Sequence, residues 1–213
     1  KHINLLNEFQ GQSRIKMMIG IDGEWGLFQR FPAAHKFPWA MTLGAIQDNS
    51  LIYEMTSKIA EDCKRLGIYW DFAPVVDVNT NPSNPIIGNR SFGSDINNVI
   101  SKGLAYAQGL QDHGVLASMK HFPGHGDTNT DSHLDLPVVS HNLERLNSVE
   151  LAPFKALLDK KIGGVMVAHL YVPTLEKKKG IPASVSYEII TNLLNYTYQY
   201  KGLIITDALN MNA

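Results

Sequence analysis

The sequence predicts an α/β fold, a (β/α)8 barrel of the TIM type that is incomplete within these 213 residues. Two observations carry this prediction. Short β-rich apolar runs alternate with longer segments of helical period, and an ionisable residue follows each run. Strands that are apolar on both faces and alternate with helices indicate a parallel sheet buried between helices. No composition shift or linker divides the chain, so we expect one domain over residues 1–213.

The elements can be placed in order along the chain. Five runs have the length and composition of buried strands, at residues 15–21, 68–76, 115–119, 164–168 and 202–206. Helical periods predict a helix over 51–66 and another over 96–112. Helix-end signals stand at the expected places: Asp95 and Ser186 as capping residues, Pro153 in a first turn, Gly67 and Gly114 just past an end.

The residues at the strand ends favour a barrel over an open doubly wound sheet. Each predicted strand is followed by an ionisable group: Asp22, Asp77, Lys120 with His121, His169 and Asp207. In a barrel these carboxyl ends converge on one mouth, where barrel enzymes build their sites. An open sheet usually binds at one switch point through a glycine-rich phosphate loop, and this sequence has no such loop.

Composition excludes several classes of protein. Lys and Arg number 19 against 20 Asp and Glu, so no basic excess exists to bind nucleic acid in general. No apolar run approaches the roughly 20 residues of a membrane span. The single cysteine, Cys63, excludes an internal disulfide framework and a multi-cysteine zinc site. The oligomeric state stays open.

The densest motif is residues 120–133, K-H-F-P-G-H-G-D-T-N-T-D-S-H, which Pro and Gly place on a loop. A calcium loop does not fit, because Ser132 and Val138 stand where the turn glycine and the bidentate glutamate belong. A zinc site would use His121, His125 and His133 with an aspartate, but the glycine and proline between the first two argue against a helix there. No metal is therefore assigned.

An acid/base pair fits the same loop. Asp131 and His133 are two residues apart, so in an extended stretch both point the same way. The carboxylate can hold one imidazole nitrogen while the other shuttles a proton near neutral pH.

Read as a whole, the segment closely resembles the K-H-F-x-G-H-G-D-T-x-x-D-S-H signature of family 3 glycoside hydrolases, in the bacterial β-N-acetylglucosaminidase branch. Further segments are similar to motifs of that branch, in the same order: residues 21–31, 72–78, 89–92 and 206–211. Trp25 and Leu27 depart from it, since the branch usually has Gly and Arg there. These two replacements would change the shape of the pocket, and with it the preferred sugar or aglycone.

The resemblance implies a role for each matching residue. Asp207 would be the nucleophile and His133 the general acid/base, oriented by Asp131. The sugar-binding positions would be Asp22, Arg30, Arg90, Lys120 and His121. Asp77 and Glu24 are expected to serve capping or salt-bridge roles, His125, Asp127 and His169 to shape the loop and the mouth, and Trp25, Trp39 and Trp70 to lie in the core.

The activity this resemblance implies is hydrolysis of terminal β-linked N-acetylglucosamine, including cell-wall fragments, with retention and without a cofactor. Two alternatives stay open: phosphorolysis through the same intermediate, and a sugar-binding domain that has lost catalysis. The resemblance points to a bacterial protein of the cytoplasm or periplasm. We also expect a first strand and a closing element to be missing, because residues 1–14 open on a helical pattern and the sequence stops six residues after Asp207. A complete barrel needs about 250 residues.

Overall fold

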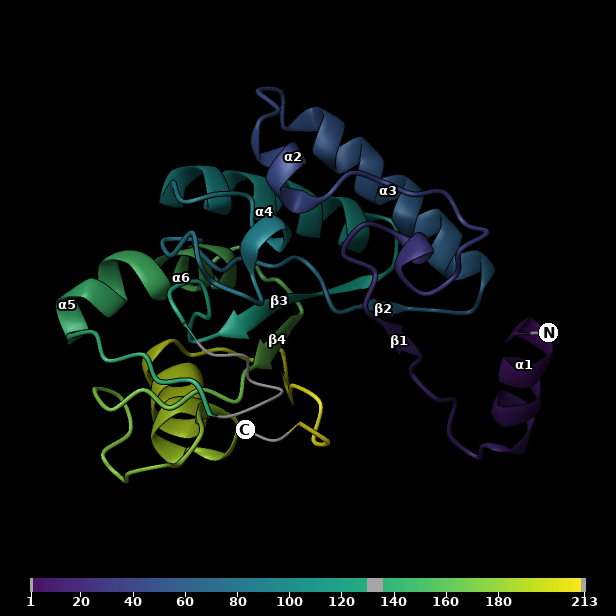
Figure 1. The fold of residues 1–213 in the computed structure, drawn as a ribbon. Helices are drawn as coiled ribbons and strands as arrows, with labels where there is room; N and C mark the ends of the chain where they lie inside the picture. Colours follow the sequence, from purple (N-terminus) through teal and green to yellow (C-terminus); the bar gives the residue numbers. More distant parts are fainter. Residues whose placement is uncertain (1, 130–135, 212–213) are drawn as a thin grey trace.

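The computed structural model describes residues 2–129 and 136–211. Its five strands form one parallel sheet in chain order, and the sheet curls as half of a barrel wall (Figure 1). The strands are β1 Gly20–Ile21, β2 Trp70–Asp71, β3 Leu116–Phe122, β4 Gly164–Val167 and β5 Leu203–Thr206. A (β/α)8 barrel has eight strands, and the described residues supply five of them. The predicted incomplete barrel is therefore confirmed.

Two long helices, α3 (Ser50–Arg65) and α4 (Ile96–Asp112), lie side by side, and α4 packs against β3 (Figure 1). Their apolar faces are buried, as the helical period predicts. Asp95 caps α4, because its Oδ1 accepts a hydrogen bond of 2.7 Å from the Asn98 amide. Gly67 and Gly114 follow the two helices at φ +73° and +80°, a conformation that favours glycine. Both helices lie within a residue or so of their predicted bounds.

The helices of the C-terminal half also begin where expected. Residues 143–158 form α5 (Leu143–Arg145), a π-helical turn (Leu146–Glu150) and α6 (Ala152–Leu158), with Pro153 in the first turn of α6. Ser186 precedes a second π-helical segment, Glu188–Thr197, and its Oγ accepts a hydrogen bond from the Ile189 amide. Among the described residues no helix is both long and apolar enough to cross a bilayer.

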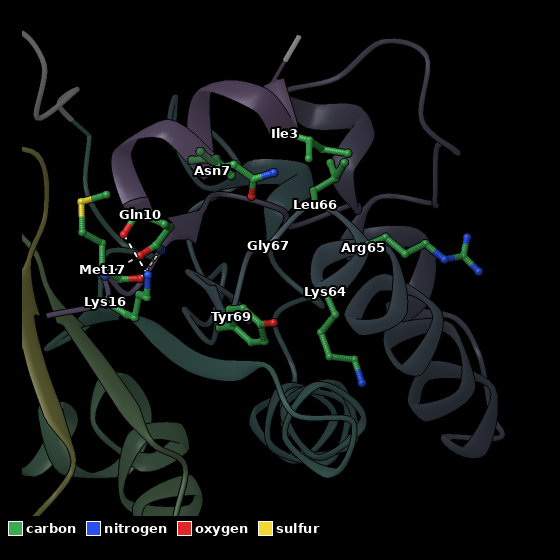
Figure 2. A pocket seen from close by; sticks show the side chains of 11 residues that line it. Ile3, Asn7, Gln10, Lys16, Met17, Lys64, Arg65, Leu66, Gly67 and Tyr69 are labelled. Atoms are coloured by element: carbon green, nitrogen blue, oxygen red, sulfur yellow. Dashed lines mark hydrogen bonds between the residues drawn. The ribbon is translucent and has the colours of Figure 1, made fainter. Parts of the chain in front are cut away.

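Helix α1 (His2–Gln12) has no buried residue and is joined to the sheet by an extended segment (Figure 1). Between α1 and the end of α3 lies a groove of about 520 Å³, where Ile3 approaches Leu66 (Figure 2). Because Met17 and Tyr69, which line the groove, precede β1 and β2, it lies at the amino ends of these strands. It is therefore away from the edge where the ionisable residues gather.

The first strand is shorter than predicted. The apolar run predicts a strand over 15–21, but β1 begins at Gly20. The Gln10 side chain hydrogen-bonds both backbone groups of Met17, at 2.9 Å to its N–H and 2.8 Å to its carbonyl. These groups are satisfied by α1 rather than by a neighbouring strand, and Ile15 is 77% exposed. A side-chain contact across seven residues leaves no periodic signal in the sequence.

The second and third strands also differ from their predicted bounds. Regular pairing of β2 stops at Asp71, although bonds such as Val76 N–H to the Lys120 carbonyl continue beside β3. Pro74 has no N–H to offer the ladder, so regular pairing is interrupted there. Strand β3 extends to Phe122, and Lys120 and His121 therefore lie within the strand rather than just after it.

Candidate active site

An ionic network occupies the carboxyl ends of β1 and β3. The Lys120 Nζ lies 2.9 Å from Asp22 Oδ1 and 2.8 Å from Glu24 Oε1. Arg90 donates to both oxygens of Glu24, at 2.9 Å from Nε and 2.8 Å from Nη2. Arg30 is the outermost member of the network, with its Nη2 2.8 Å from Asp22 Oδ2. Four of the five predicted sugar-binding residues thus meet around one buried glutamate.

The buried members of this network remain charged because they pair with one another. Lys120 is 2% exposed and Glu24 is 6% exposed. Burial alone would raise the pKa of Glu24, but the charges of Lys120 and Arg90 outweigh it and hold the pKa well below its usual range. Burial would likewise lower the pKa of Lys120, and the carboxylates of Glu24 and Asp22 raise it instead. Glu24 therefore has the salt-bridge role expected from the sequence.

His121 is held from both sides. Its Nδ1 lies 2.7 Å from Asp77 Oδ2, and its Nε2 lies 3.1 Å from Arg90 Nη2. A guanidinium can only donate, so Nε2 accepts and Nδ1 carries the proton that is donated to Asp77. Asp77 is fully buried and also accepts 2.7 Å from the His125 amide. Asp77 thus has the strand-end capping role expected from the sequence, since it accepts from the His121 and His125 amides where β3 ends.

His125 and His169 lie where the sequence suggests, at the carboxyl ends of the strands: His125 lines the cavity and His169 contacts the residue after Asp207. Burial lowers the pKa of His125 to about 4, so its ring is neutral at pH 7. The His169 Nε2 donates 3.0 Å to the Ala208 carbonyl, and its Nδ1 accepts from the Ser184 hydroxyl at 2.6 Å. His169 thereby fixes the backbone next to Asp207.

Asp207 stands directly after β5. Its amide donates 2.9 Å to the Val167 carbonyl of β4, and its Oδ1 accepts 2.8 Å from the Ala208 amide. The side chain faces a cavity of about 390 Å³. All five predicted sugar-binding residues line the same cavity: Asp22, Arg30, Arg90, Lys120 and His121. Asp131 and His133 lie outside the described residues.

Two tryptophans contradict their expected place in the core. Trp25 and Trp39 line the cavity, with ring centroids 4.1 Å apart and planes at 31°. Trp39 is 36% exposed. Both lie on connections rather than on a helix or strand, so no periodicity could have placed them. Trp70, in β2, is half-buried and donates 2.7 Å to the Ser118 hydroxyl.

Sequence reasoning also missed a buried acid beneath the site. Asp71 is fully buried at the end of β2, where its Oδ1 accepts 2.9 Å from the Gly23 amide. Its Oδ2 has no hydrogen-bond partner among the described residues. Burial raises the pKa of Asp71 to about 7. Because Gly23 lies between Asp22 and Glu24, this hydrogen bond positions both carboxylates of the network.

One group of side chains could bring metal-binding atoms together within the described ranges. Donor atoms of Asp127, His141 and Glu150 lie within 4.8 Å of one another. Arg145, however, already lies 3.1 Å from Glu150 Oε1. Two of the histidines that the sequence offered for zinc are hydrogen-bonded to protein groups instead. His121 Nδ1 pairs with Asp77, and His125 Nδ1 pairs with the Thr128 hydroxyl.

Comparison with known proteins decides the family. The model of the glycosyl hydrolase family 3 N-terminal domain matches residues 3–213. The chain belongs to glycoside hydrolase family 3. The resemblance of its motifs to that family is confirmed, and with it the expectation of a glycoside hydrolase with an incomplete barrel fold.

Two similar curated proteins are named beta-hexosaminidases, and a similar solved structure is named a β-N-acetylglucosaminidase. The chain is 38% identical to beta-hexosaminidase A of Pseudoalteromonas piscicida over 95% of its own length and 36% of the relative. It is 40% identical to beta-hexosaminidase LpqI of Mycobacterium tuberculosis, over 85% of the chain and 42% of the relative. A family 3 β-N-acetylglucosaminidase structure from Paenibacillus sp. str. FPU-7 superposes with a TM-score of 0.95 and 41% identity, over 99% of the chain and 41% of that protein. The chain thus spans less than half the length of these family 3 proteins.

Proposed function

We propose that this family 3 chain belongs to a retaining β-N-acetylglucosaminidase that removes terminal β-linked N-acetylglucosamine. The observation that carries the proposal is that Asp207 faces the same cavity as the Asp22–Lys120–Glu24–Arg90 network. A nucleophilic carboxylate beside fixed donors and acceptors is the arrangement that a retaining glycosidase needs. The names of the relatives support N-acetylhexosaminides as the substrate class.

The first step forms a covalent ester. A carboxylate oxygen of Asp207 bonds to the anomeric carbon while the glycosidic C–O bond breaks, and the leaving oxygen takes a proton from His133. In the second step water bonds to the same carbon, the ester bond to Asp207 breaks, and His133 takes the proton from water. Asp131 would hold the His133 ring in the tautomer that both steps use.

The network would bind the sugar before either step. Lys120 and Arg90 donate hydrogen bonds only, so they would bind hydroxyl or acyl oxygens, and Glu24 keeps both cations at fixed positions. Asp22 takes one cation on each oxygen and still has lone pairs for sugar hydroxyls. Trp25 and Trp39 would provide an apolar wall for the ring or the aglycone.

The test is turnover of 4-nitrophenyl β-N-acetylglucosaminide by the full-length enzyme, with product analysis in phosphate buffer. We expect free N-acetylglucosamine that first appears as the β-anomer, and the glucoside should be a poorer substrate than the N-acetyl compound. If sugar 1-phosphate is the main product, the enzyme is a phosphorylase and the proposed hydrolysis is wrong. Sugar binding without turnover of either substrate would refute catalysis and leave a binding domain.

A further inference from the structure

A cluster of four side chains lies outside the cavity of the candidate site, and two of its members, Asp127 and His141, flank residues 128–140. The His141 Nε2 contacts Asp127 Oδ2 directly, within hydrogen-bonding distance. The same Nε2 lies 4.0 Å from Glu150 Oε1, to which the Arg145 guanidinium donates at 3.1 Å. None of these four residues lines the cavity of the candidate site.

Asp127 and His141 stand at opposite ends of the segment in which the proposed acid/base pair lies. The amino end is held by asparagine side chains, since the Asn81 amide group donates 3.1 Å to the Thr128 carbonyl and the Asn84 amide group 2.8 Å to the His125 carbonyl. The carboxyl end is held elsewhere, because the Val139 amide donates 2.9 Å to the Tyr171 carbonyl. The Asp127–His141 contact joins the two ends directly.

Each partner of this contact is itself oriented. Thr80 donates 3.0 Å to the other carboxylate oxygen of Asp127, and the Thr174 hydroxyl donates 2.5 Å to the His141 carbonyl. Glu150 is 4% exposed and packs under the loop, where a Cβ at Gly124 would lie 2.8 Å from the Glu150 Cβ. The contact is therefore embedded in the fold rather than made between freely rotating surface side chains.

Resting on the proposed function, we propose that Asp127 and His141, backed by Glu150 and Arg145, are positioning residues for the acid/base. By joining the two described ends of the segment, Asp127 and His141 would restrict where the proton donor can lie relative to the leaving oxygen. Protonation needs a heavy-atom separation of about 2.6–3.2 Å, and a misplacement of about 1 Å can reduce the rate about 100-fold. The requirement is greatest for leaving groups that cannot depart without a proton.

The experiment measures leaving-group dependence in the full-length enzyme. Asp127→Ala and His141→Ala should each lower kcat/KM, which reports on formation of the glycosyl ester, about 10- to 100-fold on methyl β-N-acetylglucosaminide, which needs protonation. On the 2,4-dinitrophenyl glycoside, which needs almost none, they should stay within about threefold of wild type. That second substrate also shows that the variants are folded. His141→Gln keeps an N–H near the position of Nε2 and should recover most of the lost rate.

Two controls complete the design. His113→Ala, at the end of α4 and outside the cavity, should leave both rates unchanged. The double variant Asp127→Ala/His141→Ala should be no worse than either single variant if both act through the one contact. Equal losses on both glycosides, or no loss on either, would overturn the proposal.

Two further outcomes separate the alternatives. If His133→Ala itself shows no leaving-group dependence, the proposed function fails. If His133→Ala shows it and the Asp127 and His141 variants do not, only the positioning role fails. If treatment with EDTA lowers wild-type activity on the methyl glycoside, ZnCl₂ restores it and His141→Ala responds to neither, the cluster is a metal site and the hydrogen-bonded role is wrong.

Discussion

Asp71, at the end of β2, is a buried carboxyl group that forms no ion pair among the described residues. Among the described residues its hydrogen-bond donor is the Gly23 amide, 2.9 Å from Oδ1, and its Oδ2 has no hydrogen-bond partner there. Burial raises its pKa from 3.8 to about 7, so the folded protein holds a proton that the unfolded chain releases. We therefore expect Asp71→Asn to change how stability depends on pH.

The sign and size follow from proton linkage. A group whose pKa is raised on folding contributes its stability fully below pH 3.8 and loses it as pH rises toward about 7. Each pKa unit corresponds to about 1.4 kcal/mol, so a shift of about three units costs about 4 kcal/mol in total. About 2 kcal/mol of that is lost between pH 5 and pH 7. Asparagine cannot ionise and removes this loss, while its Oδ1 can still accept from Gly23.

The assay is urea unfolding at pH 5 and pH 7, followed by tryptophan fluorescence. The free energy of unfolding of wild type minus that of Asp71→Asn should fall by about 2 kcal/mol between the two pH values. Asp159→Asn, at an exposed position after α6, is the matched control and should follow wild type. Parallel pH curves for wild type and Asp71→Asn would refute the reasoning, because they would mean that Asp71 ionises in the folded protein without cost.

Three further predictions concern catalysis. Asp207→Ala should raise the activation barrier by several kcal/mol, with the fold kept by circular dichroism, because the covalent route disappears; near-wild-type turnover would exclude it as nucleophile. His133→Ala should lower kcat/KM for alkyl glycosides far more than for activated aryl glycosides, and Asp131→Ala should do the same more mildly, with a Brønsted plot of kcat/KM against leaving-group pKa as the measurement. Trp25→Gly should raise KM about fivefold for substrates with a bulky aglycone, from a lost stacking contact of about 1 kcal/mol, and unchanged KM values would exclude the aromatic wall.

Local signals explain why so much of the fold could be predicted. Asp95, Gly114 and Ser186 act within a few residues of their own helix ends, so a short stretch of sequence contains all the information about each of them. The position of Asp207 is equally local, because the residue that follows a buried parallel strand must emerge at the carboxyl edge of the sheet. The motifs then place the chain in glycoside hydrolase family 3, and the match to the N-terminal domain of that family covers residues 3–213.

What only the tertiary structure decided depends on partners far apart in the chain. Asp71 reads as a polar interruption of an apolar run, and its burial appears only when β2 is enclosed between β1 and β3. Trp25 and Trp39 occupy the one connection between β1 and α2, which has no periodicity, and they meet because this connection turns back on itself, with the Phe37 amide 3.3 Å from the Trp25 carbonyl. The Lys120–Glu24 contact joins two strand ends almost a hundred residues apart. Residue type and spacing determined which chemistry could be present, whereas burial and pairing, which set each charge and pKa, required the sheet to be assembled.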